Sequence, residues 1–134
     1  MGSFKELLAY KKAFNLALEI HNLSKSFPGE EMYTLTSQIR RSSRAVCSNI
    51  AEGFRKRQYP AHFISKISDA DMENSETQVW LDFAYTFGYL DETTKDQLSL
   101  QVEETGKLLS YMINHPNKFM DQPKKNVYQQ TKVI

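Results

Sequence analysis

The sequence is poor in the residues that form disulfides and metal sites. Its 134 residues include one cysteine, Cys47, and three histidines, His21, His62 and His115. A single cysteine excludes an intrachain disulfide and suits a reducing compartment. None of the histidines stands at a metal-ligand or dyad spacing with another histidine or with Cys47. We therefore expect no metal site and no catalytic centre built on these residues.

Long apolar runs are also missing. No stretch approaches the roughly 20 apolar residues that a membrane-spanning helix needs, and Lys5, Glu6, Lys11 and Lys12 interrupt every apolar stretch near the start. The sequence has no Glu-x-x-His pair of a di-metal bundle, no glycine-rich phosphate loop and no nucleophile elbow. We therefore expect a soluble, cytoplasmic protein that contacts no membrane, needs no cofactor and is not an enzyme.

Charge is nearly balanced overall but uneven along the chain. The formal net charge of +1 excludes a strongly basic nucleic-acid binder on bulk grounds. Residues 38–66 hold seven Arg and Lys against one Glu, a net charge of +6, while residues 69–104 hold ten carboxylates against one Lys, a net charge of −9. Such a division is typical of a basic surface for an anionic partner. It is also compatible with basic and acidic helices that face each other, within a subunit or between subunits.

Apolar residues recur at helical spacing in four segments that are joined by short turns. The segments run from about residue 5 to 25, from Glu30 or Glu31 to residues 54–56, from Pro60 to about Phe87, and from an N-cap at Asp91 to His115-Pro116. No strand-like alternation competes with them. The pattern predicts an all-α, antiparallel up-down-up-down four-helix bundle over residues 1–116. Residues 117–134 show no sustained period and are predicted to form a mobile tail.

The second segment has two unlike faces. One stripe is apolar or small and consists of Leu35, Ile39, Ser42, Val46, Asn49, Ile50 and Gly53. Ser42 and Gly53 are small enough to let a facing helix approach closely. Asn49 falls on the same stripe, where an unpaired amide would cost about 1–3 kcal/mol. We therefore expect Asn49 to form a hydrogen bond with a neighbouring helix, through Asn74, Thr77 or Gln78.

The first and third segments carry more apolar residues than one stripe needs. The first is predicted to bury Leu7, Tyr10, Phe14, Ala17, Leu18 and His21, with Leu16 and Leu23 on the opposite side. The third is predicted to bury Phe63, Ile67, Ala70, Asn74, Thr77, Leu81 and Ala84, which leaves Met72, Val79, Trp80, Phe83 and Phe87 outside. Such a surplus usually marks an interface. We expect a homo-oligomer that associates through Val79, Trp80, Phe83 and Phe87.

Arginines line the other side of the second segment. The candidate nucleic-acid-binding residues are Arg40, Arg41, Arg44, Arg55, Lys56 and Arg57. Arg and Lys side chains on one face are typical of phosphate contacts, and such contacts weaken steeply with salt. No aromatic stacking platform is interleaved with these arginines in the sequence, which counts against this interpretation. In the alternative interpretation the arginines make only subunit contacts.

The same segment carries a family motif. The runs Leu-Thr-Ser-Gln-Ile-Arg-Arg-Ser, from Leu35, and Ser-Asn-Ile-Ala-Glu-Gly-Phe, from Ser48, resemble the core motif of the 23S rRNA intervening-sequence proteins. The accessory variability proteins of diversity-generating retroelements belong with these, and the resemblance covers about residues 4–114. It implies a four-helix bundle and a ring-like homopentamer. Through the retroelement proteins it also implies binding to RNA or DNA and to a nucleic-acid-processing protein, a reverse transcriptase.

One stretch departs from the family pattern. Relatives commonly carry a Gly-Ser pair in the third helix, where this chain reads Asp-Met-Glu-Asn-Ser-Glu over residues 71–76. We therefore carry no functional role over to that stretch from the resemblance.

Overall fold

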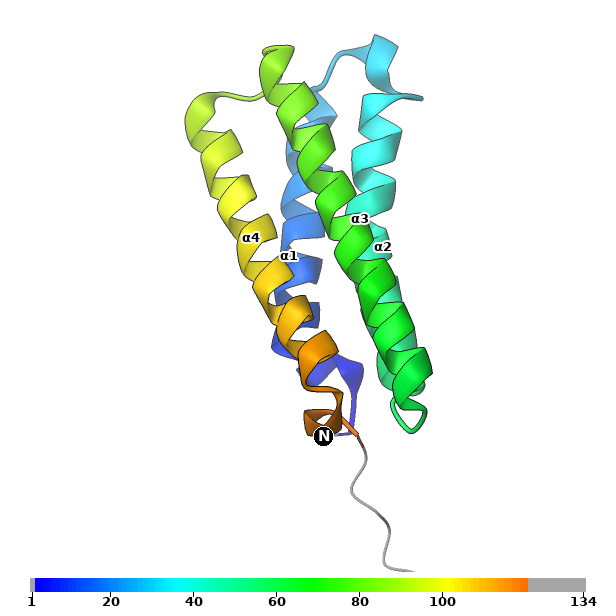
Figure 1. Ribbon diagram of the computed structural model, residues 1–134. Coiled ribbons are helices and arrows are strands. Elements are labelled where there is room, and N and C mark those ends of the chain that lie inside the picture. The colour runs from blue at the N-terminus through cyan, green and yellow to red at the C-terminus, as the bar shows by residue number, and fades with distance from the viewer. Residues whose placement is uncertain (1, 121–134) are drawn as a thin grey trace, which may run out of the picture.

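Four α-helices form the part of the chain that the computed structural model describes, residues 2–120, and no strand occurs within it. The helices are α1 (Leu8–Leu23), α2 (Leu35–Arg55), α3 (Pro60–Thr86) and α4 (Glu92–Asn114), with short 3-10 turns η1 (Phe4–Glu6), η2 (Ser24–Ser26), η3 (Gly29–Glu31) and η4 (Pro116–Lys118). Consecutive helices run in opposite directions, and both ends of the described chain lie at the same end of the bundle (Figure 1). The predicted all-α, antiparallel four-helix bundle is confirmed.

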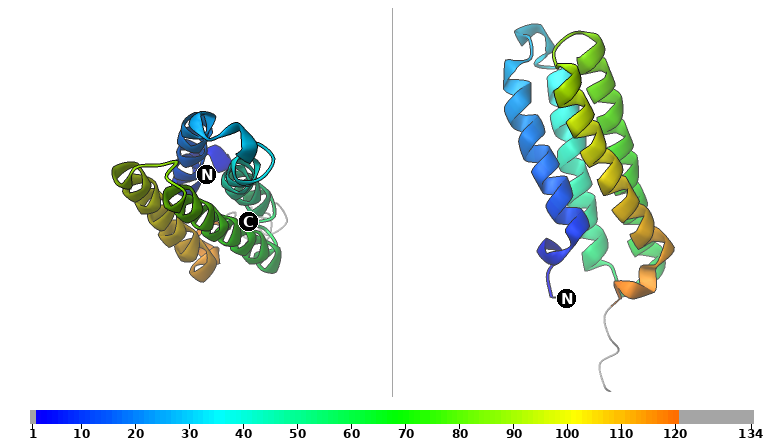
Figure 2. Two further views of the ribbon diagram at one scale, coloured as in Figure 1. Left: turned by 90° about the horizontal axis from the view of Figure 1, so that it is seen from above. Right: turned by 90° about the vertical axis from the view of Figure 1, so that its left-hand side faces the viewer.

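The helices surround one core in the order α1, α2, α3, α4. The most extensive contact is between α2 and α3, and the smallest of the four neighbouring contacts is between α1 and α4. The end-on view in Figure 2 shows α3 between α2 and α4. Buried side chains form two clusters along the axis, one around Ile50, Phe63 and Leu109 and the other around Ile20 and Leu81.

The core stripe predicted for α3 is confirmed. All seven predicted residues of α3 are buried, and α4 buries Leu98, Val102, Thr105, Leu109 and Met112. Asp91 caps α4, because its carboxylate accepts a hydrogen bond from the Thr94 backbone N–H at 2.7 Å. Gly88 ends α3 with φ at +81°, a backbone conformation that favours glycine. These signals are local, so the sequence predicts both ends of the α3–α4 turn correctly.

Apart from Leu7, which is buried, the core stripe predicted for the first helix is wrong. The residues that α1 buries are Ala9, Ala13, Leu16 and Ile20, whereas Phe14 and Leu18 are about half exposed and Tyr10, Ala17 and His21 are only partly buried. Leu16, predicted to point away from the core, is 2% exposed. Both stripes of α1 are apolar. The small Ala9 and Ala13 side chains let α1 come close to its neighbours, so their stripe faces inward and the bulkier one lies at the edge, beside α2.

Two predicted helix starts also need correction. α2 begins at Leu35 rather than at Glu30 or Glu31, because η3 is a separate turn and Thr34 has non-helical dihedrals (φ −122°, ψ −103°). The first predicted helix is divided, because the backbone of Leu7 is extended (ψ 130°) between η1 and α1. The Leu7 side chain is buried, so this break places an anchor residue in the core.

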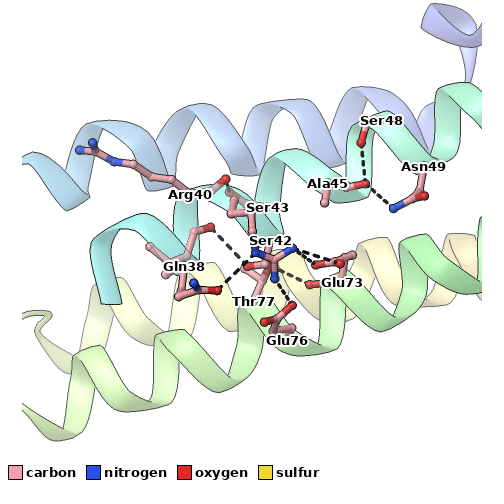
Figure 3. Close-up of polar contacts among 12 residues, drawn as sticks. Gln38, Arg40, Ser42, Ser43, Ala45, Ser48, Asn49, Glu73, Glu76 and Thr77 are labelled. Atoms are coloured by element: carbon pink, nitrogen blue, oxygen red, sulfur yellow. Dashed lines mark hydrogen bonds and ion pairs between the residues drawn. The ribbon is translucent and has the colours of Figure 1, made fainter. Parts of the chain in front are cut away.

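Asn49 does not join two helices, contrary to the prediction. Its Nδ2 donates to the Ala45 carbonyl at 2.9 Å, one turn earlier in α2, and the side chain is only half-buried. Figure 3 shows Ser48 and Asn49 both bonded to that carbonyl. The buried amide that crosses between helices is Asn74, whose Nδ2 donates to the Val102 carbonyl of α4 at 2.9 Å. Asn49 sits at the margin of the buried stripe, where its own helix satisfies it.

The bundle continues beyond residue 116, where the sequence predicts that it ends. The ring of Phe119 stacks on that of Phe63, with centroids 5.9 Å apart, and Tyr111 meets Phe119 edge-on. Phe119 and Met120, assigned by the sequence to a mobile tail, therefore pack against the helices. Residues 121–134 of that predicted tail lie outside the described residues.

Candidate functional site

The arginine row emerges along both flanks of α2. The buried stripe of α2 faces the core between α1 and α3, so side chains next to it reach toward one or the other of these helices. Figure 3 shows Arg40 on the α1 side of α2, while Glu73, Glu76 and Thr77 face α2 from α3. Arg40, Arg41 and Arg44 consequently have different surroundings, although they lie on one face in the sequence pattern.

Arg41 is paired within its own chain. Its Nη1 donates to both carboxylate oxygens of Glu73 at 3.2 Å, and its Nη2 donates to Glu76. The hydrogen bonds to Glu76 and Glu73 raise the pKa of Arg41, and the hydrogen bond from Arg41 lowers the pKa of Glu76. Both carboxylates belong to α3. Arg41 therefore holds a basic helix against an acidic one within the subunit, as one of the two interpretations of the charge pattern predicts.

Arg40 reaches the end of α1. Its Nε donates to Ser24 Oγ at 2.8 Å and its Nη2 to the His21 carbonyl at 3.5 Å. Ser24 Oγ in turn donates to the same carbonyl at 3.0 Å. The guanidinium is half-buried and has no carboxylate partner among residues 2–120. Within these residues no carboxylate therefore offsets the positive charge of Arg40.

Arg44 has a neutral partner. Its Nη2 lies 3.1 Å from Nδ1 of His21, and because a guanidinium only donates, the imidazole nitrogen must accept. Partial burial and the charges of Arg40, Lys25 and Arg44 lower the pKa of His21, which favours the neutral ring. No carboxylate of the described residues pairs with Arg44 either. Four basic groups thus meet where α1 ends beside α2.

A shallow hollow of about 590 Å³ lies along these side chains. We call it the arginine pocket, and its lining includes Thr36, Ser37, Arg40, Arg41, Arg44 and Ser48. Within the described part of the chain no carboxylate lines it. Arginine side chains beside hydroxyl groups can donate several hydrogen bonds to one anion. The arrangement is suited to a phosphate or a carboxylate.

The other three predicted binding residues lie at the far end of α2. Arg55 and Lys56 are exposed. The guanidinium carbon of Arg57 lies 3.8 Å from the centroid of the Phe54 ring, and its Nη1 donates to the Phe54 carbonyl at 3.1 Å. At 1.5 Å per residue, Arg55 is roughly 20 Å from Arg40 along the helix axis. The predicted row is therefore two basic groups rather than one continuous patch.

An apolar groove that the sequence pattern did not predict lies between α1 and α2. We call this feature the α1–α2 groove: it has a volume of about 530 Å³, and its lining includes Phe4, Tyr10, Phe14, Leu18, Arg44 and Ser48. The rings of Tyr10 and Phe14 stack with centroids 5.9 Å apart. Sequence reasoning placed Tyr10, Phe14 and Leu18 in the core. The alanines at positions 9 and 13 were the available signal that a different stripe of α1 faces inward.

Cys47 also borders the α1–α2 groove, but its thiol is not activated. Burial raises the pKa of the Cys47 thiol to about 11. Its Sγ donates to the Ser43 carbonyl at 3.8 Å. A protonated thiol is a poor nucleophile, so Cys47 is a small packing residue in this structure.

Three of the four predicted interface residues of α3 are exposed. Val79, Phe83 and Phe87 are 45–53% exposed, and we call them the α3 apolar strip. The Phe83 and Phe87 rings lie 5.7 Å apart. Trp80 differs, because it is partly buried and packs against the core. Three large apolar side chains thus share one outward line, while Trp80 supports it from beneath.

Neither a metal-binding cluster nor a membrane-spanning helix is found among residues 2–120. Within residues 2–120 no group of three or more His, Cys, Asp or Glu side chains is placed to hold a metal ion. None of the helices in that range has the length and hydropathy required to cross a membrane.

Comparisons with known proteins identify the family. The family model for the 23S rRNA-intervening sequence protein matches residues 5–111. A crystal structure of a protein with unknown function from the S23 ribosomal protein family of Bacteroides thetaiotaomicron is similar in fold, with a TM-score of 0.72 and 29% sequence identity over 80% of this chain and 96% of that one. No curated protein matches the sequence. The match spans α1, α2, α3 and most of α4, and the chain therefore belongs to the 23S rRNA-intervening sequence protein family.

Proposed function

We propose that this protein is a non-enzymatic, self-associating binding protein of the cytoplasm, and that the arginine row of α2 contacts nucleic acid or a nucleic-acid-associated protein. One observation carries the proposal. Arg40 and Arg44 line the arginine pocket without a carboxylate partner among residues 2–120, whereas Arg41 has two. Guanidinium groups that have no carboxylate partner are suited to contacts with backbone phosphates. The family description refers to 23S rRNA, which makes RNA the first nucleic acid to test.

The second basic group extends this surface. Arg55, Lys56 and Arg57 lie at the turn between α2 and α3, roughly 20 Å from Arg40. A nucleic-acid backbone that is several nucleotides long spans that separation. Both groups could therefore follow one backbone. In an oligomer the surface would be repeated in every subunit.

We assign self-association to the α3 apolar strip, supported by Trp80. Val79, Phe83 and Phe87 expose a continuous apolar line, which in water favours a second copy of the chain. The family resemblance suggests a pentamer. The strip lies on α3, whereas the arginine pocket is lined from α2 and the turn before it. Assembly and nucleic-acid binding therefore use different surfaces and can be tested separately.

A salt titration tests binding. Filter binding with labelled RNA should show an affinity that falls with salt concentration, by about 0.7–0.9 log units per log unit of salt for each phosphate contact. Arg44→Glu should weaken binding and flatten the slope. Lys107→Glu, the same charge change on α4, is the matched control and should leave binding unchanged. Wild-type protein that binds neither RNA nor DNA at low salt would overturn the proposal.

Light scattering tests assembly. Wild type should have a mass several times 15.6 kDa, and Phe83→Lys should shift it toward the monomer while the helical content stays the same. Leu100→Lys is the control, because Leu100 is similarly exposed but lies on α4. If Arg44→Glu dissociates the oligomer and wild type binds no nucleic acid, the arginines serve subunit contacts alone, which is the alternative interpretation of the sequence.

A further inference from the structure

We infer that the nucleic acid is bound as an unpaired strand, with bases in the α1–α2 groove and phosphates on Arg44 and Arg40. The inference rests on the proposed function and specifies its ligand. The feature that carries it is visible only in the folded protein. The fold brings an aromatic pair, Tyr10 and Phe14, beside the arginine row, although no aromatic residue is interleaved with the arginines in the sequence.

The groove offers faces on which bases can stack. The Phe14 side chain is 48% exposed, and its ring lies nearly parallel to that of Tyr10, with an interplanar angle of 28°. Leu18 continues the apolar floor and is exposed to a similar degree. The volume of about 530 Å³ lies within the range of about 300–1,000 Å³ that is typical of small-molecule sites. The groove therefore has room for planar, largely apolar groups.

The groove and the arginine pocket are continuous. Arg44 and Ser48 line both of them, so an apolar floor and a cationic rim share a border on α2. Arg40 lies one turn before Arg44 and lines the arginine pocket. Within the described residues no carboxylate lines either hollow. This combination of stacking surface and positive charge is what single-stranded nucleic acid requires.

A duplex and a second copy of the chain fit this surface less well. A duplex keeps its base faces inside its own stack, so it would gain little from Phe14 and Leu18. A second copy has a better site on the α3 apolar strip, which Asp82 borders with a carboxylate that suits a protein neighbour. A polyanion that also presents flat apolar groups matches both the α1–α2 groove and the arginine pocket.

Fluorescence anisotropy with three probes tests the inference. The probes are a labelled oligouridine of about 12 nucleotides, the corresponding oligothymidine, and a labelled duplex of the same length. Wild type should prefer both single strands to the duplex. Phe14→Leu keeps an apolar side chain but removes the ring, and it should weaken single-strand binding roughly 5- to 100-fold, as loss of one stacked base does. Tyr111→Leu is the control, because Tyr111 is an equally exposed aromatic residue on α4.

Each other outcome has a distinct meaning. Equal or tighter binding to the duplex, with no effect of Phe14→Leu, overturns this inference and leaves the proposed function standing. Absence of binding to all three probes overturns the proposed function itself. A Phe14→Leu protein that loses its oligomeric mass, as measured by light scattering, shows that the groove holds a second copy and also overturns the inference.

Discussion

The hydroxyl of Ser42 lies 2.8 Å from that of Thr77, in the buried seam between α2 and α3. Thr77 Oγ1 also donates to the Glu73 carbonyl at 2.9 Å. Since Thr77 uses its one proton on the Glu73 carbonyl, it accepts from Ser42, whose hydroxyl also makes a longer contact of 3.4 Å with the Ile39 carbonyl of its own helix. On the surface, Arg41 of α2 joins the same two helices through Glu73 and Glu76 of α3. Polar contacts therefore fix the alignment of the helix pair that has the most extensive contact in the bundle.

Thr77→Val should destabilise the protein by about 1–3 kcal/mol, because it removes the 2.8 Å partner of the buried Ser42 hydroxyl and leaves only the 3.4 Å contact with the Ile39 carbonyl. The free energy of unfolding from urea denaturation measures this. The double variant Ser42→Ala with Thr77→Val should recover part of the loss, because it leaves no unpaired hydroxyl. Fully additive losses in the double-mutant cycle would mean that the two hydroxyls do not interact.

Gly53→Ala should destabilise the protein, although alanine favours helix by about 1 kcal/mol. The new Cβ would lie 2.8 Å from Ile67 Cδ1 and 3.2 Å from Lys66 Cβ. Ile67 is fully buried and has no free space to move into, so overpacking of about 1–3 kcal/mol outweighs the gain. Gly106→Ala is the matched comparison, since its nearest contact, Asn74 Nδ2 at 3.4 Å, is ordinary. A thermal melt should show a lower Tm for the first variant and an unchanged or higher Tm for the second.

Acid should affect stability and binding in opposite directions through His21. Its pKa is lowered below the ordinary 6.5 by partial burial and by Arg40, Lys25 and Arg44. As the pH falls from about 6.5 through the lowered pKa, the unfolded chain takes up a proton before the folded one, so the free energy of unfolding decreases. The same proton adds a positive charge beside Arg44, which should strengthen binding to nucleic acid.

Urea denaturation and anisotropy at about pH 7.5 and pH 5.5 measure both effects. His21→Asn keeps an acceptor near Arg44 but cannot be protonated, so this variant should lack both pH-dependent components. If wild type and His21→Asn respond alike to pH, His21 is not the responsible group.

Cys47 should react slowly with thiol reagents in the folded protein. Its pKa of about 11 leaves on the order of 100-fold less thiolate near pH 7.5 than a thiol with an ordinary pKa. Alkylation by iodoacetamide, followed by mass spectrometry, should be slow under native conditions and fast in denaturant. Rapid native alkylation would show that the thiol is exposed or activated by the nearby arginines.

The sequence predicts the fold and the α3 stripe because these depend on local periodicity. In α3 one stripe keeps helical spacing from Phe63 to Ala84, and only Asn74 and Thr77 interrupt its apolar residues. In α1 two apolar stripes compete, and the choice between them depends on how closely Ala9 and Ala13 let the neighbouring helices approach. That distance is set by the partner helices, so the α1 sequence alone does not contain it.

The sequence likewise predicts one part of the candidate site and not the other. The arginine row is visible in the sequence because its members lie on one helix. Arg41 and Arg44 differ in their partners, which belong to other helices. Arg41 binds carboxylates of α3, whereas Arg44 binds the imidazole of α1. The Tyr10–Phe14 pair was assigned to the core for the same reason. Side chains that meet across helices become a site only once the packing is known.

Arg40 forms two hydrogen bonds with the end of α1, and these affect how its variants should be interpreted. Its contacts with Ser24 Oγ and the His21 carbonyl place a full positive charge at the carboxyl end of α1, where the helix macrodipole concentrates about half a negative charge. It caps a helix from which it is 16 residues distant along the chain. A substitution by a neutral or acidic residue there removes this cap together with the cation. Arg44, which makes no backbone contact among the described residues, is therefore the cleaner position at which to separate charge from folding.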